Sequence, residues 1–123
     1  MIGYVYVSSF PYYDVQAKQT RFKNRPVLVI GQADVKDYIV LPISRVTNRV
    51  HLDPLYDVEV RPNNVPLMNL HTTSYIRTHK QSVLHVASLV RPIVDVRTEY
   101  PEVYLDVIAK MEAFQKNIID KAL

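Results

Sequence analysis

The chain has 123 residues, of which 48% are hydrophobic and 22% are charged. These values are typical of a folded protein, exclude a largely disordered chain, and predict a single domain over residues 1–123. Cysteine is absent, which excludes disulfides, thiolate metal sites and a cysteine nucleophile.

The acidic residues are unevenly distributed along a chain whose formal net charge is +3. Residues 15–33 and 60–94 contain arginine and lysine but no aspartate or glutamate. If these two acid-free segments meet in the fold, they form a positive face that attracts a polyanion, and nucleic acid is the simplest candidate. The alternative is a pair of unrelated solvated loops.

The first residues lack the basic and apolar regions of a secretory signal, and no stretch approaches the length that spans a bilayer. We therefore expect a cytoplasmic protein with no membrane partner.

The first 98 residues predict a small, mainly β structure. Short runs rich in valine, isoleucine and tyrosine recur at residues 4–7, 27–30, 38–41, 56–60, 73–76 and 83–86, with turn-forming residues between them. Strands at this spacing favour a barrel or a sandwich. Because Arg25 directly precedes Pro26, we expect it to project from a loop at the start of the strand at 27–30.

The last residues predict an amphipathic helix over about 101–122. Apolar side chains recur there with a period near 3.6, and Pro101 and Glu102 suit a first helical turn. We expect the apolar stripe to pack on the β structure; its members are Tyr104, Val107, Ile108, Met111, Phe114, Ile118 and Ala122.

Several kinds of active site find no support in the sequence. The four histidines show no zinc-ligand spacing, and the two glycines cannot build a phosphate-binding loop. We therefore expect no metal and no cofactor. The polar residues that remain at strand ends suit phosphoryl chemistry on RNA, which brings its own 2′-hydroxyl nucleophile and needs a base, an acid and cations around the phosphate.

Three blocks of residues resemble the MazF/PemK family of toxins. The first contains residues 3–7, Phe10-Pro11-Tyr12-Tyr13-Asp14 and the strand that begins with Arg25-Pro26; the Phe-Pro segment corresponds to a loop in that family. The second is residues 40–44, and the third runs from residue 70 to 89. The resemblance implies a small SH3-like barrel of the MazF, Kid and CcdB type with a C-terminal helix, forming a homodimer.

The same resemblance implies an activity and partners. Members of the family are toxins of type II toxin–antitoxin systems that cut single-stranded RNA, including mRNA, at specific sequences without a metal. They leave 2′,3′-cyclic phosphate and 5′-hydroxyl ends, and thereby inhibit translation and growth. A MazE/PemI-like antitoxin would silence the toxin, and operator DNA would be bound only through the complex with that antitoxin.

The resemblance also nominates site residues. Arg25 matches the family's Arg-Pro arginine, and Ser44 stands where many members have threonine. Residues 79–85 depart from the family's Asp-Gln-x-Arg-Thr-x-Asp pattern, so His79 becomes the candidate for proton transfer and Arg77 the candidate for charge neutralisation. The candidate RNA-binding residues are Tyr12, Tyr13, Lys18, Arg21, Lys23, Arg45, Thr73, Ser74, Lys80 and Gln81.

Other interpretations stay open at this point. The same barrel occurs in CcdB-like toxins that bind gyrase, and the altered third block also suits an RNA-binding barrel without catalysis. Ser44 and Ser74 can simply close strand ends with backbone hydrogen bonds, and His85 suits a half-buried structural position.

Overall fold

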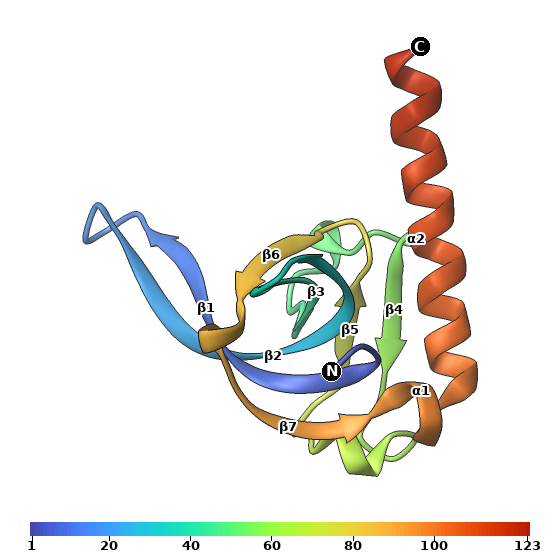
Figure 1. Ribbon diagram of the computed structural model, residues 1–123, viewed down its shortest axis with the longest axis horizontal. Helices are drawn as coiled ribbons and strands as arrows, with labels where there is room; N and C mark the ends of the chain where they lie inside the picture. Colours follow the sequence, from blue (N-terminus) through green and yellow to red (C-terminus); the bar gives the residue numbers. More distant parts are fainter.

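Seven antiparallel strands and one long C-terminal helix make up the protein in a computed structural model that describes residues 1–123 (Figure 1). The strands are β1 (Tyr4–Asp14), β2 (Gln19–Asp34), β3 (Asp37–Ser44), β4 (Asp57–Val60), β5 (Ser74–Arg77), β6 (Ser82–His85) and β7 (Leu89–Asp95). A short helix α1 (Val96–Glu99) leads into α2 (Pro101–Ala122), and three single-turn 3₁₀ helices lie in the loops: η1 (Arg49–His51), η2 (Pro66–Met68) and η3 (Val86–Ser88).

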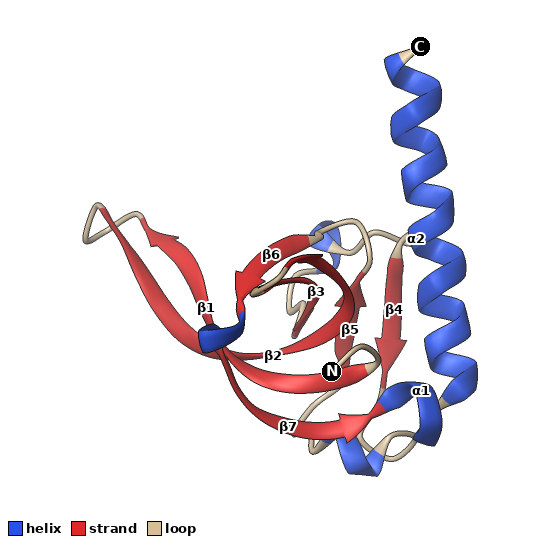
Figure 2. Cartoon of the chain, in the orientation of Figure 1, coloured by secondary structure: helices blue, strands red, loops and turns tan.

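The sheet curls strongly upon itself (Figure 2). Its strand order is β4-β5-β3-β2-β1-β7, and β6 pairs with a second stretch of β3. The curl is carried by β2, which pairs with β1 along residues 19–28 and with β3 along residues 27–34. The prediction of a mainly β fold with a C-terminal helix is confirmed. The seventh strand, β7, was not predicted, because Arg91 and Pro92 interrupt its apolar pattern.

The surroundings of Arg25 differ from the prediction. Arg25 does not project from a loop: β2 already begins at Gln19, and Arg25 pairs with Ser8 in the middle of the β1–β2 ladder. Pro26 is tolerated inside the strand because pairing with β3 ends at Val27, so Pro26 lies where β2 has a neighbour on one side only. Residues 10–14, expected as a loop, likewise belong to β1.

The core lies inside the curl and is closed by α2. A cluster of 12 buried side chains joins β1, β2, β3, β4 and β5 to the helix, where Val107 is fully buried. Burial of one such valine contributes about 1.5–3 kcal/mol. Of the predicted stripe, Tyr104, Val107 and Met111 pack in or against the core. Ile108 is exposed instead, and Ile118 is 44% exposed, since the C-terminal turns of α2 extend beyond the sheet (Figure 1). None of the helices combines the length and apolar character that crossing a membrane requires.

Candidate functional site

Two adjoining cavities lie where β2, the end of β3 and the loop before β5 come together. The larger has a volume of about 670 Å³ and the smaller about 340 Å³. Arg25, Ser44 and Arg45 line both cavities, so these three residues form a shared wall between them. The remaining wall of the larger cavity includes residues 68–72 and β7, and that of the smaller cavity includes residues 46–48, His51 and the end of β5.

The cavities are strongly basic. No aspartate or glutamate lines either of them, whereas six basic side chains do: Lys23, Arg25, Arg45, Arg77, Lys80 and Arg91. Five of these come from the two acid-free segments of the sequence, and Arg45 comes from the end of β3. The prediction that the two segments meet in one positive region is therefore confirmed. Such a concentration of cations suits an anionic ligand.

Arg25 is the half-buried cation at the centre of this region. Its guanidinium carbon lies 5.2 Å from the centre of the Phe10 ring, and it forms no ion pair with a carboxylate. Its backbone carbonyl accepts a 2.7 Å hydrogen bond from the hydroxyl of the fully buried Ser8. Burial, with a smaller contribution from the charge of Arg77, lowers the pKa of Arg25. The side chain stays protonated, so it is an incompletely solvated cation that a bound anion would stabilise.

The two candidate serines have different environments. Ser44 lines both cavities, and its hydroxyl makes no hydrogen bond within the chain. Ser74, at the start of β5, is only 5% exposed, and its hydroxyl donates a 3.1 Å hydrogen bond to the Thr72 carbonyl. The Ser44 hydroxyl is thus free to contact a ligand, whereas Ser74, which also lines the larger cavity, uses its hydroxyl to secure a strand end.

Arg77 reaches the smaller cavity from a buried ion pair. Its Nε lies 3.1 Å from Oδ1 of Asp57, its Nη2 lies 3.3 Å from Oδ2, and the same Nη2 donates a 2.6 Å hydrogen bond to the His51 carbonyl. Arg77 is 9% exposed and the Asp57 side chain 3%. The guanidinium is therefore held in one orientation.

His79 lies away from the cavities. It lines neither of them, and its ring packs against the rings of Tyr56 and Phe114 at centroid distances of 6.0 and 6.2 Å. Its Nδ1 is buried without a hydrogen-bond partner and lies 3.8 Å from Oδ1 of Asp57. Burial lowers the pKa of His79, although Asp57 acts in the opposite direction. The structure thus does not bring this candidate base to Arg25 and Ser44.

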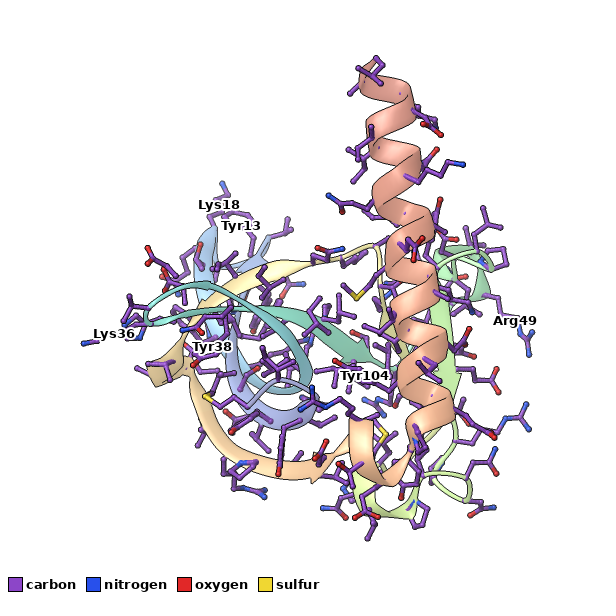
Figure 3. All side chains as sticks on the ribbon, turned by 45° about the vertical axis from the view of Figure 1, so that its right-hand side comes forward. Tyr13, Lys18, Lys36, Tyr38, Arg49 and Tyr104 are labelled. Carbon is purple, nitrogen blue, oxygen red and sulfur yellow. The ribbon has the colours of Figure 1, made fainter.

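The β1–β2 hairpin carries half of the predicted RNA-binding residues and projects from the sheet as an arm (Figure 1). On one face, three diagonal pairs join the strands: Arg25 over Phe10 at 5.2 Å, Lys23 over Tyr12 at 5.3 Å, and Arg21 to Asp14 at 3.2 Å. We call these pairs the hairpin ladder. Tyr13, whose partner Thr20 is next to Arg21, is exposed near the tip, where Lys18 adopts a positive φ of 53° in the turn (Figure 3).

The remaining predicted residues are divided between the cavities and the open surface. Arg45 and Lys80 line cavities, whereas Thr73 and Gln81 are exposed and line neither.

Two histidines that the sequence analysis did not nominate do line the cavities. His71 lies on the larger cavity and His51 on the smaller, and both are exposed. Little in the sequence indicated that these histidines would line a cavity. His71 stands just before the Thr72-Thr73-Ser74 run, and His51 is on the loop that follows Ser44. No three histidine or carboxylate side chains are grouped as a metal site would require.

Comparison with known proteins identifies the fold. No protein-family model matches the chain, and no curated protein matches it. Among solved structures, the Mycobacterium tuberculosis toxin MazF-mt6 is similar over 89% of this chain and 96% of that chain, with a TM-score of 0.59 and 16% sequence identity. At this identity the likeness concerns the fold. The chain therefore has a MazF-like fold, a curled antiparallel half-barrel with a C-terminal helix, as the sequence predicted.

Proposed function

We propose that the chain is the toxin of a toxin–antitoxin pair and acts as an endoribonuclease that cuts single-stranded RNA at specific sequences without a metal ion. The MazF-like fold supports the toxin class. The observation that carries the activity is the shared wall of the two cavities, where Arg25, Ser44 and Arg45 meet in a basic region that no carboxylate lines.

The proposed reaction is a transesterification within RNA. The ribose 2′-oxygen forms a bond to the adjacent phosphorus while the bond from phosphorus to the 5′-oxygen breaks. A base takes the 2′-hydroxyl proton and an acid gives a proton to the leaving 5′-oxygen, so the products carry a 2′,3′-cyclic phosphate and a 5′-hydroxyl. The protein has to supply these two groups and to stabilise the negative charge that develops on the phosphate.

The shared wall suits the phosphate. Arg25 lacks an anionic partner and can donate to two phosphate oxygens at once, and the free Ser44 hydroxyl can donate a third hydrogen bond. His51 and His71 each line a different one of the two cavities that meet at this wall. A phosphate bound at the wall would have one histidine on each side, which is the arrangement that an in-line attack and departure needs. We assign proton transfer to these two residues, in place of His79.

The hairpin ladder supports an RNA-binding role for the arm. Residues on one face of a strand repeat about every 6–7 Å, so Arg25, Lys23 and Arg21 form a row of cations that leads away from the shared wall. Phosphates of an extended RNA strand can follow such a row, and the exposed ring of Tyr12 on the same face can stack on a base. Tyr13 is exposed on the opposite face of the hairpin. We propose that Lys18 at the tip and Lys80 beside the smaller cavity extend this track.

The proposal includes partners. We propose that two copies of the chain form the active toxin, that a MazE/PemI-like antitoxin silences it, and that operator DNA is bound only by the complex. The likeness to a MazF toxin supports these assignments. Light scattering on the purified chain measures its oligomeric state. A mass equal to one copy of the chain would exclude the proposed homodimer.

Cleavage of a long single-stranded RNA in the presence of EDTA tests the activity. The wild-type chain should cut the RNA, and Arg25→Ala should lower the rate by about 100-fold or more, as loss of a charge-stabilising donor does. Arg49→Ala is the matched control, because Arg49 lines neither cavity and points away from the sheet (Figure 3). Intact RNA with folded wild-type protein would overturn the proposal. RNA that binds but stays intact would select the barrel without catalysis, and inhibition of gyrase supercoiling would select the CcdB-like alternative.

A further inference from the structure

A buried polar cluster lies directly behind the smaller cavity. Asp57 begins β4 and pairs across the sheet with Arg77, the last residue of β5, so the register of the two strands creates their ion pair. Two residues after Arg77, the chain brings His79 back against the same carboxylate. The cluster therefore joins a group that the proposed RNA would reach, Arg77, to one that it would not reach, His79.

Asp57 holds Arg77 with both of its carboxylate oxygens. Oδ1 accepts from Arg77 Nε, and Oδ2 accepts from Arg77 Nη2 and, at 2.8 Å, from the Asp53 backbone N–H. The Arg77 Nη1 group makes no hydrogen bond within the chain. Because Arg77 lines the smaller cavity together with Arg25 and Ser44, a fixed guanidinium with one nitrogen to spare faces the proposed phosphate site.

His79 approaches the oxygen that fixes Arg77. Its Nδ1 is 3.8 Å from Asp57 Oδ1, which is too far for a hydrogen bond, and this nitrogen is buried without any other partner. The ring cannot easily turn away, because Tyr56 and Phe114 pack against it and against each other at 5.0 Å. Oδ1 accepts one hydrogen bond, from Arg77 Nε, and a buried nitrogen without a partner lies beside it. A proton on that nitrogen would make His79 a second donor to the same oxygen.

The buried surroundings of His79 favour its neutral form. Burial lowers its pKa, and the nearby cations Arg77 and Lys80 act in the same direction. Asp57 and Asp53 oppose them. From α2, Lys110 faces the same cluster: its Nζ donates a 3.1 Å hydrogen bond to the Asp57 backbone carbonyl and lies 3.7 Å from the carboxylate of Asp106.

We propose that His79 is a positioning residue that controls the orientation of Arg77 through the shared Asp57 carboxylate. While the His79 ring is neutral, Asp57 Oδ1 accepts a hydrogen bond from Arg77 alone. When the ring takes up a proton, its Nδ1–H is drawn to Oδ1 and its positive charge repels the Arg77 guanidinium, so the Arg77 Nε hydrogen bond weakens and the cation in the smaller cavity is less firmly fixed. The consequence for RNA cleavage rests on the proposed function, whereas the competition for Oδ1 does not.

Nuclear magnetic resonance of the full chain tests the competition without any RNA. As the pH is lowered from 8 until the His79 ring is protonated, the Arg77 Nε–H resonance should move with the same midpoint as the His79 ring. It should stop moving in His79→Phe, which keeps an aromatic ring and removes both nitrogens. His85→Phe, at an exposed histidine, should leave the movement unchanged. An Arg77 resonance that is constant in the wild-type chain, or that still titrates in His79→Phe, would overturn the inference.

The cleavage rate supplies a second readout. We expect kcat/KM of the wild-type chain to fall by roughly tenfold more than that of His79→Phe when the pH is lowered from 7 until His79 is protonated, the effect of one charge-assisted hydrogen bond. Equal pH profiles would contradict the positioning role, because a purely structural histidine would not change the profile. If the wild-type chain cuts no RNA at any pH, the proposed function fails, and the Arg77 resonance alone decides this inference.

Discussion

Arg25 and Arg77 line the same cavity, but only Arg77 has a carboxylate partner. Arg25 is half-buried over an aromatic ring and has no carboxylate partner, whereas Arg77 is buried and paired with Asp57 through two nitrogens. An unpaired cation is available to a ligand, while a paired one mainly holds its surroundings in place. Residue type alone therefore does not define the role of an arginine in this site; its anionic partner, or the lack of one, does.

The largest expected effect on stability comes from removing the charge of the carboxylate that pairs with Arg77. Asp57→Asn should lower the free energy of unfolding by about 3–5 kcal/mol, because it leaves Arg77 as a buried cation without its counter-charge. Urea denaturation measures this. The matched control is Asp14→Asn, which breaks the exposed ion pair with Arg21 and should cost about 1 kcal/mol or less. Equal losses of unfolding free energy in the two variants would show that burial does not make the Asp57–Arg77 ion pair more important for stability than the Asp14–Arg21 pair.

A smaller effect should separate the two serines beside these arginines. Ser44→Ala should lower the cleavage rate about tenfold, since a free hydroxyl on the shared wall can donate one hydrogen bond to the phosphate. Ser74→Ala should leave the rate per folded molecule unchanged, because that hydroxyl is committed to the Thr72 carbonyl. Initial rates under EDTA distinguish them. A Ser74 variant that loses more activity than the Ser44 variant would move the phosphate site towards β5.

The stability of the folded chain should depend on pH through His79. Because the pKa of His79 is lowered in the folded chain, the unfolded chain, with a pKa of about 6.5, takes up the proton first as the pH falls. The free energy of unfolding should therefore rise with pH across the interval between the lowered folded pKa and 6.5, and level off above it. His79→Phe should flatten this rise in urea denaturation series. If the free energy of unfolding rises by the same amount in His79→Phe, groups other than His79 cause the pH dependence.

The smallest effect is expected along the hairpin ladder, where cations pair only with aromatic rings or an exposed carboxylate. Lys23→Gln should weaken binding to single-stranded RNA and reduce the slope of log affinity against log salt by about 0.7, the value for one phosphate contact. Lys36→Gln is the control, since Lys36 is on the β2–β3 turn, away from both cavities (Figure 3). If both variants give the same slope as the wild-type chain, RNA does not follow the ladder.

The sequence predicted the strands and the helix because their apolar periodicity is local. It also predicted that Arg25 and Ser44 belong together, and the structure brings them to one wall. The placement of His79 could not be read in this way, since the ring is held by Phe114 of α2, 35 positions further along the chain. The length of the β1–β2 arm was also missed, because Pro11 and Pro26 are normally signs that a strand has ended.

The chemical identity of the RNA ends after cleavage shows whether the chain is the proposed metal-independent endoribonuclease. A defined single-stranded transcript should be incubated with the purified wild-type chain in EDTA, and the new termini mapped. We expect 2′,3′-cyclic phosphate and 5′-hydroxyl ends at a small set of sequence-related positions, absent with Arg25→Ala and present with Arg49→Ala. Intact transcript, or 3′-hydroxyl and 5′-phosphate ends, would contradict it.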